Sequence, residues 1–292
     1  MTNIVLEQAT KDYNPKFVSI NEEMIEILPF DTTQIYFFFR KKGYIPIDNY
    51  QANISFILGF NSINYQHWTI NLEKRFIRYE NNGLVGSEAV FDGFYNLHQA
   101  LFNGSLNIDF IQDGDLAKFF GNIPERRYRL EVIRENQNKM AQVMTILETD
   151  AANGLIDTNT ARKLAELMPK SFSDPYLKKI QTALYEISEL LTIKYPRLKT
   201  DLTVGAEYQL PKVLEAMGIL QYSPEIKKKI SIPILFTQNS LEESAIRAAT
   251  IIACDKICKN QKIESSYLDR FLQENRKNFG NIKFHLTKTN MY

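Results

Sequence analysis

The sequence has almost no net charge, because 35 Lys and Arg residues balance 34 Asp and Glu residues over 292 positions. Proteins that coat nucleic acids or adhere electrostatically to membranes carry a large excess of positive charge. The balance therefore argues against a broad surface that binds polyanions. We expect no direct nucleic-acid partner and no membrane partner.

Cysteine is scarce, and Cys254 and Cys258 are the only two in the chain. Their spacing of four residues within a helical pattern is too short for an ordinary structural disulfide. The three histidines, His67, His98 and His285, show no metal-ligand spacing. We expect small buried thiols in a reducing compartment, with no metal and no cofactor.

Long apolar runs are also missing, since no uncharged stretch approaches the roughly 20 residues that span a bilayer. The N-terminal segment lacks a basic stretch followed by an apolar one, which is the pattern of a secretion signal. These two absences predict a cytoplasmic protein.

Glycine and proline are sparse, with 12 and 10 residues, whereas average usage is about 7% and 5%. Few helix breakers and a hydrophobic content of 44% predict long helices around a sizeable core. No repeat or low-complexity linker divides the chain. We therefore predict a mostly α fold, as a single helical domain over residues 1–292.

Capping residues and prolines mark the expected helix ends. Asn21, Asp174, Ser223, Ser240 and Ser265 are candidate N-caps, and two of them precede prolines. Apolar residues at spacings of three and four complete the pattern. The helical segments that we predict are 21–28, 88–101, 126–149, 174–191, 211–217, a short one from 224, 240–258 and 265–279. The later segments form a helical body over residues 88–280.

A small β element is predicted near the N-terminus, within residues 30–85. The runs 34–40 and 54–60 are rich in aromatic and β-branched residues, and the segment 70–79 is extended in character. Asn82-Gly83 is a turn signal. We expect a few short strands in this region.

Familiar catalytic motifs are missing, since the chain has no P-loop, no Rossmann glycine fingerprint, no H-E-x-x-H and no G-x-S-x-G. Carboxylates are the remaining candidates. Glu207 stands out, because it follows the small and apolar residues 203–206 and precedes a helix with an early proline. A carboxylate in this setting can be partly desolvated and act as acid, base or nucleophile. The ordinary alternative is a solvated glutamate before a helix.

The run 204–211, Val-Gly-Ala-Glu-Tyr-Gln-Leu-Pro, resembles a motif that usually reads F-A-D-Y-R-x-P-Q in the queuosine salvage proteins, the queuosine 5′-phosphate N-glycosylase/hydrolase family. Further resemblances follow in the family's order. Residues 63–68 resemble L-N-F-S-F-W, 172–174 resemble F-R-D, 240–247 resemble G-S-x-x-E-x-E-I-R, and 268–274 resemble L-D-Y-Y-L-W-D. Because these motifs cover most of the chain, it is identified as a diverged member of this family.

The resemblance implies a mostly helical fold similar to that of helix-hairpin-helix DNA glycosylases, acting on a small nucleotide or nucleoside. Family members hydrolyse the N-glycosidic bond of queuosine 5′-monophosphate and release queuine, a deazaguanine base, for tRNA modification. Breaking this bond develops positive charge on the sugar, which a carboxylate can stabilise or capture covalently.

The resemblance also implies the site residues. Glu207 takes the place of the family's aspartate nucleophile and is one methylene longer. Gly205 stands where a phenylalanine packs on the base. Asp269 and Glu274 match two acidic residues that contact the base, and Arg270 stands where the family has tyrosine.

Aromatic and basic residues complete the expected substrate site. Trp68 and Tyr208 are expected to be aromatic walls that exclude water. Gln209 replaces an arginine of the family. Lys178 and Lys179 are the nearest counterparts of a basic pair that the family carries in the helix beginning near residue 174.

Three alternatives stay open on the sequence. The first is an N-glycosidase that acts on another modified purine. The second is a nucleotide- or nucleobase-binding protein that kept the fold without catalysis, and the third is a purely structural protein. Turnover and binding measurements with queuosine compounds discriminate among them.

Overall fold

The computed structural model describes residues 3–27, 49–71, 76–232, 234–279 and 282–292. Helices dominate this part of the chain, which confirms the predicted mostly α fold. None of them combines the length and hydropathy that a membrane crossing requires. The helices are α1 (Ile4–Asp12), α2 (Glu22–Ile27), α4 (Tyr50–Ile63), α5 (Ser87–Phe102), α6 (Asp113–Phe120), α7 (Arg126–Ala152), α8 (Thr158–Leu167), α9 (Pro169–Phe172), α10 (Lys178–Lys194), α11 (Gln209–Ala216), α12 (Pro224–Ser231), α13 (Leu241–Gln261), α14 (Ser265–Asn275) and the 3-10 helix η1 (Arg276–Phe279).

The strands are short and pair two by two. The antiparallel pairs are β1 (Val18–Ile20) with β8 (Leu220–Tyr222), β2 (Trp68–Ile70) with β3 (Phe76–Arg78), and β4 (Glu80–Asn81) with β5 (Leu84–Val85). The parallel pairs are β6 (Leu155–Asp157) with β7 (Lys199–Asp201), and β9 (Leu235–Phe236) with β10 (Leu286–Thr287).

The predicted β region 30–85 contains strands β2 to β5. Asn82-Gly83 forms the turn between β4 and β5, as expected, and both residues have positive φ angles, of 51° and 74°. The run 34–40 lies outside the described residues.

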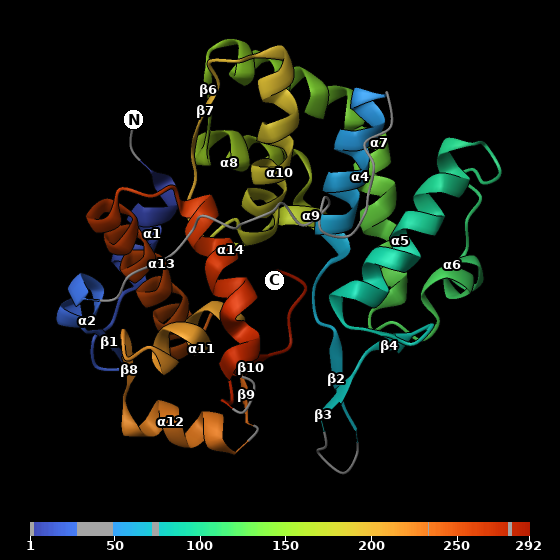
Figure 1. Cartoon of the computed structure of the whole chain (residues 1–292). Coiled ribbons are helices and arrows are strands. Elements are labelled where there is room, and N and C mark those ends of the chain that lie inside the picture. Colours follow the sequence, from blue (N-terminus) through green and yellow to red (C-terminus); the bar gives the residue numbers. More distant parts are fainter. Residues whose placement is uncertain (1–2, 28–48, 72–75, 233, 280–281) are drawn as a thin grey trace.

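The predicted extended run at 54–60 is wrong, because these residues lie inside α4. Every residue of this helix from Ala52 to Ile63 is buried, and α4 packs between α7 and α10 (Figure 1). A helix covered on all sides has no polar face, so its sequence lacks the pattern of a surface helix. The apolar run therefore looked like a strand.

The predicted capping residues mark the starts of several helices correctly. The Oγ atom of Ser223 accepts a hydrogen bond from the Ile226 amide at the start of α12, and Ser240 does the same for Glu243 in α13, both at 3.3 Å. Ser265 is the first residue of α14, but its hydroxyl donates to the Leu202 carbonyl instead of capping the helix. Side-chain capping therefore works for two of these three serines.

Two groups of helices meet around the connection from β7 to α11. One group contains α4, α7, α8 and α10, and the other contains α1, α11, α13 and α14 (Figure 1). The connection, residues 202–208, is buried along most of its length and includes Glu207. The fold thus places the candidate catalytic segment at the junction of both groups.

Candidate active site

Helix α10 holds the start of the segment that leads to Glu207. The Thr203 amide donates to the side-chain oxygen of Gln181 at 2.8 Å, and the Tyr185 hydroxyl donates to the Thr203 carbonyl at 2.7 Å. All three residues are buried. A buried backbone that is not in a helix or strand needs such partners for its polar groups.

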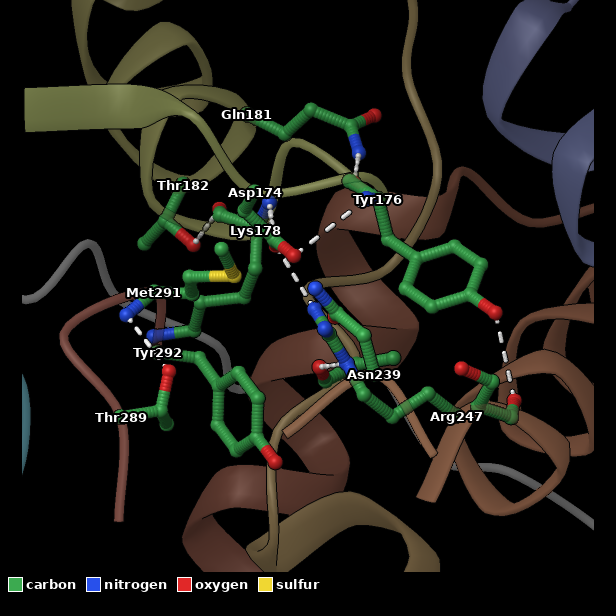
Figure 2. Close-up of polar contacts among 12 residues, drawn as sticks. Asp174, Tyr176, Lys178, Gln181, Thr182, Asn239, Arg247, Thr289, Met291 and Tyr292 are labelled. Carbon is green, nitrogen blue, oxygen red and sulfur yellow. Dashed lines mark hydrogen bonds and ion pairs between the residues drawn. The ribbon is translucent and has the colours of Figure 1, made fainter. Parts of the chain in front are cut away.

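Arg247 of α13 holds the other end of this segment. Its Nε donates to the carbonyl of Ala206 at 3.0 Å, directly before Glu207, and its Nη2 reaches Asp174 Oδ2 at 2.6 Å. Figure 2 shows this guanidinium beside Asp174, with the rings of Tyr176 and Tyr292 next to it; the rings lie 4.6 and 4.3 Å from its central carbon.

The start of α10 corrects one prediction. We expected this helix to begin at Pro175, directly after Asp174 as its cap. The helix α10 instead begins at Lys178, after Leu177 in a left-handed conformation. Arg247 binds Asp174, which lies 73 positions earlier in the sequence, and its Nη1 lies 3.7 Å from Oε1 of Glu243.

Burial alone would lower the pKa of Arg247, but the charges of Asp174 and Glu243 outweigh burial and raise it. The guanidinium therefore stays charged inside the protein, where two carboxylates and two aromatic rings surround it.

Glu207 is buried, with 5% of its surface exposed. Its Oε1 accepts a hydrogen bond from Nε2 of Gln273 in α14 at 3.0 Å, and Oε1 of Gln273 accepts one from Nη1 of Arg276, also at 3.0 Å. Sequence reasoning missed Gln273. Its one signal was the spacing of four from Asp269, which places both residues on the same face of α14.

Asp269 lies beside the same segment, because the Gly205 amide donates to its Oδ2 at 2.6 Å. The pKa of Asp269 is raised to about 6, chiefly by burial and also by the charge of Glu207, while the Gly205 amide and Lys178 act in the opposite direction. The structure therefore brings Glu207 and Asp269 together from segments that are more than sixty residues apart.

Two other predicted residues of α14 do not join them. Arg270 turns to α10 and pairs with Glu186 at 3.3 Å, and burial lowers its pKa. Glu274 is exposed on the helix surface. The face of α14 that meets Glu207 is the one carrying Asp269 and Gln273.

Gly205 is buried in a narrow space. A Cβ atom there would lie 3.1 Å from Oγ1 of Thr182 and 3.3 Å from both Asp269 Oδ2 and Lys178 Cγ. The place where the family has a phenylalanine is therefore filled by α10 and α14. Glycine lets the backbone amide approach the Asp269 carboxylate.

The two predicted aromatic residues belong to one row of rings. Trp68 packs on Phe76 with 5.6 Å between the ring centroids, Phe76 meets Phe284 edge to face at 6.4 Å, and Phe284 stacks on Tyr208 at 4.8 Å. Phe76 and Phe284 were not predicted. The row connects the β2–β3 pair with the residue that follows Glu207.

The two lysines at the start of α10 differ in environment. Lys179 is buried, and its ammonium donates to the Ser62 carbonyl at 2.8 Å and lies 4.7 Å from the Tyr65 ring. Burial lowers its pKa, as does the nearby charge of Arg129. Lys178 is half-buried beside Gly205.

Residues 183–292 match the family model described as queuosine salvage protein. A protein of Sphaerobacter thermophilus named queuosine 5′-phosphate N-glycosylase/hydrolase is 25% identical over 281 residues, which cover 84% of this chain and 83% of that protein. These two matches support the queuosine salvage family for this chain. A protein with the same name from Dictyostelium discoideum is 36% identical over 56 residues, which are 19% of this chain and 17% of that protein.

The family match spans the part of the chain that contains Glu207, Gln273 and Asp269. It begins within α10 and ends with the segment that carries Phe284. Trp68 precedes it. The predicted family is confirmed, while the roles of individual residues stay predictions.

Proposed function

We propose that this protein hydrolyses the N-glycosidic bond of a queuosine nucleotide or nucleoside and releases queuine. The observation that carries the proposal is the placement of two carboxyl groups, Glu207 and Asp269, at one buried segment, where Glu207 bonds to Gln273 and Asp269 to the Gly205 amide. Both lie in the part of the chain that matches the family. The named activity of the relatives supports the same reaction.

Glu207 has the role of nucleophile or charge stabiliser at the anomeric carbon. As the bond from this carbon to the base nitrogen breaks, its electron pair goes to the base, and the sugar becomes positively charged. The Glu207 carboxylate stabilises this charge or bonds to the carbon. Water then adds its oxygen to the anomeric carbon, any bond from this carbon to Glu207 breaks with its electron pair returning to the carboxylate, and the proton lost by the water restores the acid that protonated the base.

Asp269 has the role of contacting the base and supplying its proton. A carboxyl group with a pKa of about 6 carries a proton on part of the molecules near neutral pH. Protonation makes the base a better leaving group. Tyr208 and Trp68 lie on the aromatic row beside the site, which limits the access of bulk water.

The test is to incubate the purified protein with queuosine and with queuosine 5′-monophosphate and to measure free queuine by chromatography. We expect release of queuine, and we expect Glu207→Gln to abolish it, because an amide neither stabilises nor captures the positive sugar. Glu166→Gln, at an exposed position of α8, is the matched control.

No release from either compound would refute the proposed activity. Binding of the intact nucleotide without release would instead favour a non-catalytic binding protein. Release by Glu207→Gln at the wild-type rate would refute the role of Glu207 alone.

A further inference from the structure

Arg129 of α7 holds the connection that leads from α4 to β2. It is buried, and its guanidinium donates hydrogen bonds to carbonyls at the end of α4 and in this connection. The acceptors are Ile63, the last residue of α4, Tyr65 at 2.8 Å and Gln66 at 3.4 Å. Nε of Arg129 donates to the Pro124 carbonyl at 2.8 Å, so each nitrogen of this side chain has a backbone partner.

A second buried cation, Lys179 of α10, meets the same place. Its ammonium donates to the Ser62 carbonyl at 2.8 Å and lies 4.7 Å from the centroid of the Tyr65 ring. The central carbon of Arg129 lies 3.9 Å from the centroid of that ring. The last carbonyls of a helix have no partners within the helix and carry a partial negative charge, which nearby cations stabilise. Two cations therefore fix the end of α4.

Arg129 is better suited than a lysine to this task. Its pKa is lowered to about 10, chiefly by burial, so the guanidinium stays positively charged at neutral pH. An arginine side chain also presents several N–H groups in a rigid planar fork, whereas a lysine has a single nitrogen. The fork lets one side chain bind several carbonyls of the connection at once.

Gln66 shows that the connection is constrained. Its φ angle is 36°, in the left-handed region that residues other than glycine rarely adopt. A backbone in such a conformation persists because its surroundings impose it, and here Arg129 binds the Gln66 carbonyl. Directly afterwards the chain enters the strand pair. The His67 carbonyl accepts a hydrogen bond from the Tyr79 amide at 2.8 Å, and Trp68 begins β2.

Trp68 links this connection to the candidate active site. It packs on Phe76, and the row of rings continues through Phe284 to Tyr208, the residue after Glu207. Packed rings depend on one another's positions, because a gap of less than 1 Å already loses much of the contact energy. The connection before Trp68 sets where this row begins.

We infer that Arg129 is a positioning residue of the active site, which fixes the connection from α4 to β2 and thereby the place of the Trp68 ring. The inference rests on the glycosidase activity proposed above. A displacement of about 1 Å can lower the rate of an enzyme about a hundredfold. Loss of the Arg129 hydrogen bonds is therefore expected to reduce activity even in a protein that stays folded.

The first test compares Arg129→Lys and Arg129→Met with the wild type. Arg129→Lys keeps a cation but loses the fork of donors, so we expect it to fold and to lower kcat/KM for the cleaved queuosine compound about tenfold. Arg129→Met should lower it further. Arg127→Met is the matched control, because it removes a positive charge from an exposed position of the same helix. It should keep the wild-type kcat/KM.

Circular dichroism at the assay temperature shows which variants are folded. A folded Arg129→Lys protein with the wild-type kcat/KM would overturn the inference, since a purely structural arginine changes the melting temperature alone. Arg129→Lys decides the question if Arg129→Met does not fold.

A second measurement needs no substrate. Trp68 is the single tryptophan of the chain, so its indole N–H gives one peak in a ¹H–¹⁵N NMR spectrum. We expect this peak to move in folded Arg129→Lys and to stay in place in Arg127→Met. An unmoved peak in Arg129→Lys contradicts the inference. No queuine release by the wild type would refute the proposed function instead, and the peak would still show whether Arg129 fixes Trp68.

Discussion

At the scale of single residues, the orientation of Glu207 depends on Gln273. Glu207 is one methylene longer than the aspartate of the family motif, so its carboxylate has one more rotatable bond. The hydrogen bond from Gln273 fixes one oxygen, and Arg276 in turn fixes Gln273. Catalysis demands placement within about 1 Å, so for the role that we propose for Glu207 we expect this pair of hydrogen bonds to position the longer side chain.

Gln273→Leu is expected to lower kcat about tenfold or more while KM changes little, because the carboxylate loses its orientation but the substrate contacts remain. Steady-state measurement of queuine release checks this. Gln51→Leu, at an exposed position of α4, is the control. A wild-type kcat in Gln273→Leu would show that orientation is set elsewhere.

Asp269 gives the reaction an expected pH dependence. Because burial raises its pKa to about 6, the proton that we assign to the departing base is lost as the pH rises through this value. We expect kcat to decrease above about pH 6, and Asp269→Asn to lose this limb of the profile together with most of its activity. A flat profile in the wild type would contradict the assigned role.

The same shift affects stability with a definite sign. The folded protein holds the Asp269 proton up to about pH 6, whereas the unfolded chain loses it near the ordinary value of 3.8. The folded state therefore binds more protons between these values, and the free energy of unfolding decreases as the pH rises through this window. The melting temperature of Asp269→Asn relative to the wild type should increase from pH 4 to pH 7, with Asp109→Asn as control.

At the scale of elements, Gly205 lies between residues of α10 and α14. Any side chain at this position meets Thr182, Lys178 and Asp269. Gly205→Ala is expected to lower the free energy of unfolding by about 1 to 3 kcal/mol, and Gly205→Phe by more, although phenylalanine is the residue of the family motif. Chemical denaturation measures both values.

Gly114 of α6 is the matched control, since nothing lies within 4 Å of an added Cβ. Gly114→Ala should raise stability by up to about 1 kcal/mol, because alanine favours the helix. A Gly205→Ala protein as stable as the wild type would show that α10 and α14 separate easily.

Local signals predicted the elements better than the site. Ser223 and Ser240 predict the starts of α12 and α13, because a capping hydroxyl bonds to an amide only three residues later in the sequence. The helix α4 was not predicted, because a helix that is buried on all sides has no polar face and therefore no amphipathic pattern in its sequence. The pairing of Asp174 with Arg247 spans 73 residues, and no local pattern encodes it. Glu207 was indicated by its local context and by the family resemblance, and Asp269 by the resemblance alone, whereas Gln273 had only its spacing of four from Asp269 as a signal.

At the scale of the whole molecule, Arg247 joins parts of the chain that are distant in sequence. It contacts the turn before α10, the segment that contains Glu207, and the ring of Tyr292. Tyr292 completes the arrangement by donating its hydroxyl to Glu243 at 2.7 Å. The guanidinium is therefore a central connection between the two groups of helices.

Arg247→Met is expected to lower the free energy of unfolding by about 3 to 5 kcal/mol, because it leaves the buried carboxylates of Asp174 and Glu243 without their cation. Arg162→Met removes an exposed pair with Glu166 and should cost less than about 1 kcal/mol. Urea denaturation of both variants measures the difference. Equal decreases in the free energy of unfolding would show that the buried ion pairs of Arg247 stabilise the protein no more than an exposed pair does.

The aromatic row beside the site has an optical consequence. Trp68 is the single tryptophan of the chain, it is 4% exposed, and it packs on Phe76, two residues from Arg78 on the same strand pair. Indole emission from this protein therefore originates at one place, in the aromatic row beside the candidate active site. A ligand that enters between the strand pair and Tyr208 is expected to change the polarity around that indole, so the fluorescence of the unlabelled protein would report its binding.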